Sequence, residues 1–153
     1  MGHDLDRDAA LARIGQVFAD VPRPDDDELL HPSCADDGDI RELSRYARWQ
    51  DVPDAVVERE YAALSFLSAE GFRHFLPAYL RFVLRNDDLG QAAIGSTLAS
   101  LDPGRFGAEL EAFQRSKYVR FTEDERRAVG AFLDVMADHE EIGDAVDAWP
   151  SGS

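Results

Sequence analysis

The feature that most constrains the fold of this chain is a strongly apolar, aromatic segment at residues 64–84. It holds four of the nine phenylalanines, and its large apolar side chains are those of Leu64, Phe66, Leu67, Phe72, Phe75, Leu76, Tyr79, Leu80, Phe82, Val83 and Leu84. Burying one side chain of this size stabilises a fold by about 1.5–3 kcal/mol. Whatever lies inside this protein must therefore pack on this segment.

The apolar residues from Phe72 to Val83 follow the i, i+3, i+4, i+7 spacing of one helix face. Ser68 stands just before this run, where its hydroxyl can accept a hydrogen bond from a free amide of the first turn. Glu70 lies in that turn, next to the positive end of the helix dipole. The pattern predicts a helix that begins after Ser68.

Pro77 interrupts this helical pattern. It has no amide for the ladder of helical hydrogen bonds, and its ring disfavours helical angles at Leu76. We expect a Pro-kinked helix, or two helices that meet at Pro77. A pocket shaped by Gly71 and Pro77 is the alternative.

The string LSFLSAEGFRHFLPAYLRFVLR, residues 64–85, resembles an LSFL-x-x-EGFR-x-FLPAY signature. A family of small uncharacterised bacterial proteins carries this signature. The similarity is weaker at residues 49–53 and 121–132, where a T-x-x-E-R-x-A-V-x-x-F-L pattern recurs. The resemblance implies a helical domain without an assigned activity and supplies no catalytic residues.

Helical spacing recurs along the rest of the chain. Residues 6–19, 91–101 and 140–149 show it, and Thr122 with Glu125 forms a capping box before a clean apolar face at residues 129–136. Residues 117–121 alternate like a strand but are too short to build a sheet. The sequence predicts an all-α fold, a single compact multi-helix domain over residues 1–153 with residues 1–5 and 150–153 frayed.

Two further helices are expected between residues 39 and 63. Residues 39–50 are expected to bury Ile40, Leu43, Tyr46 or Ala47, and Trp49. Residues 53–63 begin with a proline, which suits an early helical position. This second helix is expected to face inward with Val56, Val57 and Tyr61.

Bulk properties describe a folded protein of one domain. The chain has 153 residues, 44% of them hydrophobic, which is enough for an ordinary core. Cys34 is the only cysteine, so no intramolecular disulfide forms and a reducing compartment is compatible. The first residues lack a secretory signal, and no apolar run approaches the roughly 20 residues that span a bilayer. We expect a cytoplasmic protein without membrane contact.

The net charge of −15 is the most unusual bulk feature, and it is unevenly spread. Residues 1–60 carry 16 acids and 7 bases, residues 61–121 carry 6 and 7, and residues 122–153 carry 9 and 2. Such a field repels nucleic-acid phosphates and favours basic partners. We therefore expect no nucleic acid and a partner protein with a basic surface; solubility alone is the alternative explanation.

Two acidic loops are the candidate partner-binding residues. They are Asp25, Asp26, Asp27 and Glu28 in a solvated connection that starts a short turn, and Asp36, Asp37 and Asp39 in a loop rich in turn residues. His31 and Cys34 show an H-x-x-C spacing, but a soft metal needs three or four ligands. The aspartates also miss the spacing of a calcium loop. We expect no metal and no cofactor.

A pocket around Glu70, His74 and Tyr79, next to Pro77, is the alternative site. A carboxylate paired with a histidine in a cleft can do acid–base work. No nucleophile or oxyanion donor accompanies this pair, so no catalytic residue is assigned.

The leading hypothesis is an acidic helical protein that binds another protein, such as an inhibitor or immunity-type partner of a basic protein. The alternative is a small enzyme or ligand-binding domain with the pocket around His74 and Tyr79. A mimic of DNA is a third class. The acids cluster in loops rather than in rows, which disfavours it.

The central segment generates a stability prediction. Phe75→Ala should lower the free energy of unfolding by about 3–5 kcal/mol, as for other buried Phe truncations. Urea denaturation measures this loss. A loss below about 1 kcal/mol would mean that Phe75 is exposed.

Overall fold

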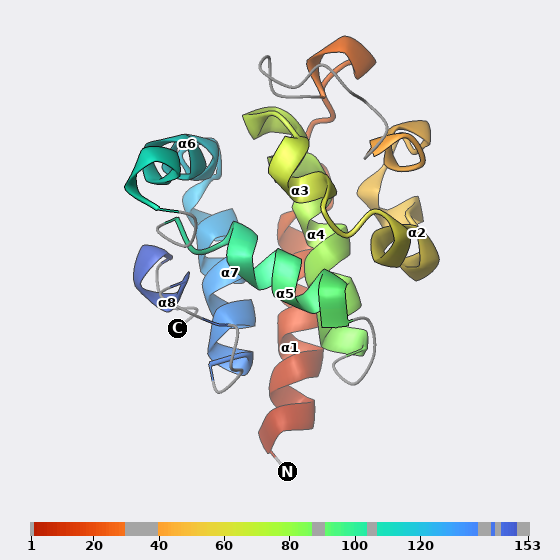
Figure 1. The fold of residues 1–153 in the computed structure, drawn as a ribbon. Coiled ribbons are helices and arrows are strands. Elements are labelled where there is room, and N and C mark those ends of the chain that lie inside the picture. The colour runs from red at the N-terminus through yellow and green to blue at the C-terminus, as the bar shows by residue number, and fades with distance from the viewer. Residues whose placement is uncertain are drawn as a thin grey trace. The chain divides into compact units, whose positions relative to one another are not determined.

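The structure of the chain is a computed structural model that describes residues 2–29, 40–86, 91–103, 107–137, 142 and 145–149 (Figure 1). In these ranges the regular elements are helices and no strand occurs, so the predicted all-α fold is confirmed. The chain divides into two compact units. The first consists of Met1–Asp20 and Leu98–Ser153, and the second of Val21–Thr97. The single domain over residues 1–153 stays a prediction.

The second unit is organised around α4, which runs from Ala69 to Arg85. Ser68 caps it as expected, because its hydroxyl accepts a hydrogen bond from the Gly71 amide at 3.1 Å. Its buried residues are Gly71, Phe72, His74, Phe75, Leu76, Pro77, Ala78, Tyr79, Leu80, Phe82, Val83 and Leu84. The aromatic segment is thus the core that the sequence predicts.

Pro77 does not divide α4 into two helices. The helix is continuous from Ala69 to Arg85 with Pro77 inside it. A proline inside a helix costs about 3 kcal/mol or more. Leu76, Pro77 and Ala78 are all buried, so the packing of this apolar face offsets that cost. The kink stays a prediction.

Two short helices pack on α4 in the second unit. α2 runs from Asp54 to Arg59, and α3 from Ala63 to Phe66. The prediction of one helix over residues 53–63 was wrong, because the chain turns at residues 60–62. Tyr61 lies in this turn and is 43% exposed, so its expected inward position was also wrong.

The helix predicted over residues 39–50 was wrong as well. From Ile40 onward the chain forms two 3-10 turns, η3 over Leu43–Arg45 and η4 over Trp49–Asp51, with extended backbone between them. Ile40, Leu43 and Trp49 are buried as expected, whereas Tyr46 is only partly buried and Ala47 is exposed.

Side chains of Glu60 and Arg81 hold the backbone of this irregular stretch. The Glu60 carboxylate accepts hydrogen bonds from the amides of Glu42 and Leu43 at 2.7 and 2.8 Å. Arg81 of α4 donates to the carbonyls of Gln50 and Val52 at 3.1 and 2.6 Å. These two amides and two carbonyls therefore find their partners in side chains from other parts of the chain.

The first unit is built on the pairing of α1 with α7 (Figure 1). α1 runs from Gly2 to Val17 and α7 from Glu123 to Val135. The predicted capping box of α7 is confirmed: the Glu125 amide donates to the Thr122 hydroxyl at 3.1 Å, and the Thr122 amide donates to the Glu125 carboxylate at 2.8 Å.

An aromatic cluster lies in the same unit, which also contains α6, Ala108–Tyr118, and α8, Ala145–Ala148. The Trp149 ring lies 4.5 Å from that of Tyr118 and 5.3 Å from that of Phe121, and Phe18 meets Phe121 edge-on. The Trp149 indole donates to the Leu101 carbonyl at 3.0 Å. α5, Gln91–Ser100, carries the chain from the second unit into the first.

Gly71 generates a prediction about stability. A Cβ atom at this position would lie 2.8 Å from the backbone oxygen of Leu29 and 3.2 Å from a methyl group of Leu67. The backbone cannot move away cheaply, so Gly71→Ala should lower the free energy of unfolding by about 1–3 kcal/mol. Urea denaturation followed by circular dichroism measures the change.

Gly15 is the matched control, because it lies in α1 and a Cβ atom there meets nothing within 4 Å. Gly15→Ala should raise the free energy of unfolding by about 0.5–1 kcal/mol through helix propensity. The two substitutions are therefore expected to act with opposite signs. Equal stabilisation by both would show that Leu29 is not close to α4.

Candidate functional site

The acidic segment, residues 25–28, belongs to the second unit and carries four of the side chains predicted to bind a partner. Asp25, Asp26, Asp27 and Glu28 are all exposed. η1, a 3-10 turn over Asp26–Glu28, is closed by the Glu28 amide, which donates to the Asp25 carbonyl at 2.8 Å. The expected short turn with solvated acids is present, and partner binding by these acids stays a prediction.

The far end of the acidic segment is attached to the start of α4. The Ser68 amide donates to the Leu29 carbonyl at 2.7 Å, and the Ser68 hydroxyl donates to the Glu28 carbonyl at 2.7 Å. The Leu29 side chain is fully buried. Gly71 allows this close approach because it has no Cβ atom. The backbone of the acidic segment is therefore fixed where it meets α4.

Arg23 fixes the near end of the acidic segment. Its guanidinium donates to the carbonyls of Pro24, Ser44 and Tyr46 at 2.8–3.0 Å, and to the Asp26 carboxylate at 2.9 Å. It also lies over the Phe75 ring, 5.9 Å from the centroid. Asp26 is thus partly engaged within the protein, although its side chain remains 82% exposed.

The three residues of the alternative pocket lie on α4 but do not share one environment. Glu70 is exposed at the first turn. His74 is buried, and its Nδ1 atom lies 3.2 Å from the carbonyl oxygens of both Val21 and Pro22. Tyr79 is fully buried and donates its hydroxyl to the Glu60 carbonyl at 2.8 Å. His74 and Tyr79 therefore face different segments of the chain, and a shared pocket stays a prediction.

Burial sets the ionisation of these groups. It lowers the pKa of His74 against the effect of its two carbonyl partners, and the Arg23 charge lowers that pKa further. It raises the pKa of Tyr79 far above its usual range. It also raises the pKa of Glu60, although the two amide hydrogen bonds to that carboxylate oppose the shift. His74 and Tyr79 are thus held in their neutral forms near neutral pH.

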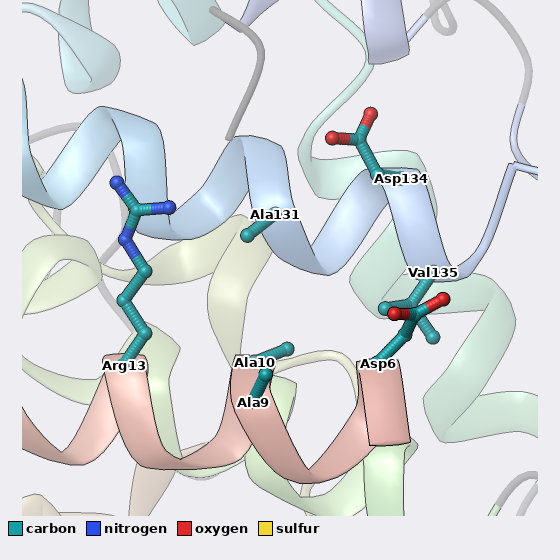
Figure 2. Close-up of a pocket in the computed structure, with 7 residues that line it drawn as sticks. All are labelled: Asp6, Ala9, Ala10, Arg13, Ala131, Asp134 and Val135. Carbon is teal, nitrogen blue, oxygen red and sulfur yellow. The ribbon is translucent and has the colours of Figure 1, made fainter. Parts of the chain in front are cut away.

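The first unit contains a groove that was not predicted from the sequence (Figure 2). It has a volume of about 330 Å³ and lies between α1 and α7, lined by Asp6, Ala9, Ala10, Arg13, Ala131, Asp134 and Val135. Its alanines leave the space open. Figure 2 shows Arg13 reaching toward α7, and Asp6 beside Val135 near the other end. Small residues on both helices are the sequence signal that could have revealed it.

The second acidic loop, with Asp36, Asp37 and Asp39, lies outside the described residues, as do His31 and Cys34. In the described ranges no three His, Cys, Asp or Glu side chains gather as a metal ion would require. Among the helices described, none has the length and apolar character needed to cross a membrane.

Comparison with known proteins assigns a family. The model of a family of unknown function (DUF6714) matches residues 6–151. No curated protein and no solved structure matches the chain significantly. The match confirms the prediction, made from the resemblance at residues 64–85, that the chain has relatives without an assigned activity.

The hydrogen bonds of Arg23 generate a prediction. Arg23→Lys replaces a planar fork by one ammonium, which cannot reach four acceptors in these directions. The free energy of unfolding should fall by about 1–3 kcal/mol. Arg41→Lys is the control, since Arg41 is exposed in the same unit, and it should change stability by less than about 0.5 kcal/mol. Equal effects in urea denaturation would contradict the role given to Arg23.

Proposed function

The chain belongs to this family of unknown function, and because the family supplies no activity, we propose a function from the chain's own surface: it is an acidic module that binds a basic protein. The sharpest version is an inhibitor or immunity-type partner that covers a basic functional surface. The observation that carries the proposal is the acidic segment, four exposed acids on an anchored backbone.

The anchoring favours binding for an entropic reason. A flexible acidic loop loses conformational freedom when a partner orders it, and this cost reduces the affinity. Here Arg23 holds one end of the acidic segment and Ser68 holds the other. The Asp25, Asp27 and Glu28 side chains meanwhile stay exposed. The backbone that carries these acidic side chains is therefore already ordered before a partner binds, so less conformational entropy is lost on binding.

The charge of both units supports a basic partner. The first unit carries 16 acids and 8 bases, and the second carries 15 and 8, so their net charges are −8 and −7. Residues 61–121, which are nearly neutral by themselves, are therefore divided between two units that are each acidic. A field of one sign speeds the approach of an oppositely charged protein and disfavours nucleic acid.

Two further parts of the proposal come from the sequence. Asp36, Asp37 and Asp39 are further proposed contact residues, in addition to the acidic segment. The protein acts in a bacterial cytoplasm, a reducing compartment that suits its single Cys34.

The proposal predicts salt-dependent binding. The protein is immobilised and incubated with lysate of its native host, and retained proteins are identified and purified. Asp25→Asn, Asp26→Asn and Asp27→Asn combined should slow association with the retained partner about tenfold at about 20 mM salt. The difference should shrink at about 300 mM salt, where the Debye length is near 6 Å.

A control of equal charge change is Asp8→Asn, Asp51→Asn and Glu58→Gln combined, all at exposed positions that do not belong to the acidic segment. It should slow association by less than about threefold, since it lowers the overall charge alone. Circular dichroism should show that both variants are folded. Equal slowing by the two variants would place the contact elsewhere, and association that ignores salt would contradict a charged contact.

A further inference from the structure

His74 fastens the start of the chain segment that carries the acidic residues. Its Nδ1 atom lies 3.2 Å from the carbonyl oxygens of Val21 and Pro22. Both neighbours are acceptors, so Nδ1 carries the proton and donates it. The ring also stands edge-on to Phe75, with centroids 4.6 Å apart. One neutral imidazole therefore positions the two residues that precede Arg23.

The other ring nitrogen of His74 has no such partner. Nε2 is buried and makes no hydrogen bond within the part of the chain that the structure describes. A second proton would have to sit on this nitrogen, as a buried positive charge without an acceptor. Among the described residues the charge that acts on the ring is the cationic Arg23, from the segment packed against it. On α4 itself, Glu70 one turn earlier is exposed to solvent.

We infer that His74 is a pH-sensitive switch that holds residues 21–29 on α4 at neutral pH and releases them on acidification. The protonated ring is hydrated only when it leaves its buried position, and leaving breaks both hydrogen bonds to Val21 and Pro22. In the closed form residues 21–29 are held on α4, and in the open form they are released. The closed form therefore binds fewer protons than the open form.

The direction of the pH effect follows from this difference. Burial keeps the pKa of closed His74 below its ordinary value of 6.5. The stability of the closed form is then fully present above about pH 6.5 and falls as the pH drops below it. Between about pH 7.5 and about pH 5.5 the opening equilibrium should rise by up to about tenfold, since one proton distinguishes the two forms.

The consequence for partner binding rests on the proposed function, whereas the opening itself does not. A released segment loses the fixed backbone that presents Asp25, Asp27 and Glu28. The partner should then dissociate more readily in acid.

Amide hydrogen exchange of the full-length protein tests the switch without any partner. The Ser68 amide donates to the Leu29 carbonyl, so its protection reports whether residues 21–29 are closed on α4. Its opening constant, corrected for intrinsic exchange, should rise by up to about tenfold from about pH 7.5 to about pH 5.5. The Arg126 amide, bonded to the Thr122 carbonyl in the first unit, is the reference and should change less than about twofold.

The chain has four histidines, so a change of pH alone does not assign the effect to His74. His74→Asn is therefore the matched variant. The Asn amide nitrogen can donate from nearly the position of Nδ1 and does not titrate. Opening should then be the same at both pH values. His74→Gln serves as a second non-titrating donor if His74→Asn fails to fold.

Two results in the exchange experiment would overturn the switch. One is a Ser68 opening constant that does not change with pH in the unmodified protein, and the other is an equal rise in the non-titrating variant. The variant with three aspartates changed to Asn keeps His74 and should still open in acid. If this variant opens in acid but retains the partner, the proposed function is wrong and the switch stands. If it loses the partner but does not open in acid, the switch is wrong and the proposed function stands.

Discussion

The close approach of the Leu29 carbonyl to the first turn of α4 is the contact on which the second unit depends. The Ser68 amide donates to this carbonyl at 2.7 Å, and a Cβ atom at position 71 would lie 2.8 Å from the same oxygen. Glycine at position 71 leaves room for this contact at the first turn of α4. The contact places the acidic segment directly beside the start of the most buried helix, which is why exposed acids stand on a fixed backbone.

Side chains that serve as backbone partners hold the irregular part of this unit together. Arg23, Glu60 and Arg81 each bond two or more main-chain groups of residues 40–53. Each of these charged groups is at least partly buried, and burial lowers the pKa of Arg81 and raises that of Glu60. The desolvation cost is offset because several backbone groups would otherwise lack partners. The chain gains a defined path there without forming a helix.

Neutral polar groups on α4 face inward, whereas the acidic segment, residues 25–28, faces solvent. The buried polar side chains of α4, His74 and Tyr79, are neutral near neutral pH and form hydrogen bonds with backbone carbonyls. The acids of residues 25–28 are exposed to solvent. The two proposals concern the same segment, residues 21–29. Its acidic side chains are exposed to solvent, and its backbone is held by the neutral imidazole of His74.

Local features of the sequence determined the helix starts, the central core and the exposure of the acidic segment. Caps such as Ser68 with Gly71, or Thr122 with Glu125, involve residues three positions apart, so the sequence alone reveals them. The continuity of α4 through Pro77, the exposed Tyr61 and the 3-10 turns after Ile40 were decided by tertiary packing. The partners of His74 lie 52 and 53 residues away, and the groove between α1 and α7 joins helices more than 100 residues apart. Such features depend on which distant groups satisfy one another once the chain is folded, and no local pattern encodes that choice.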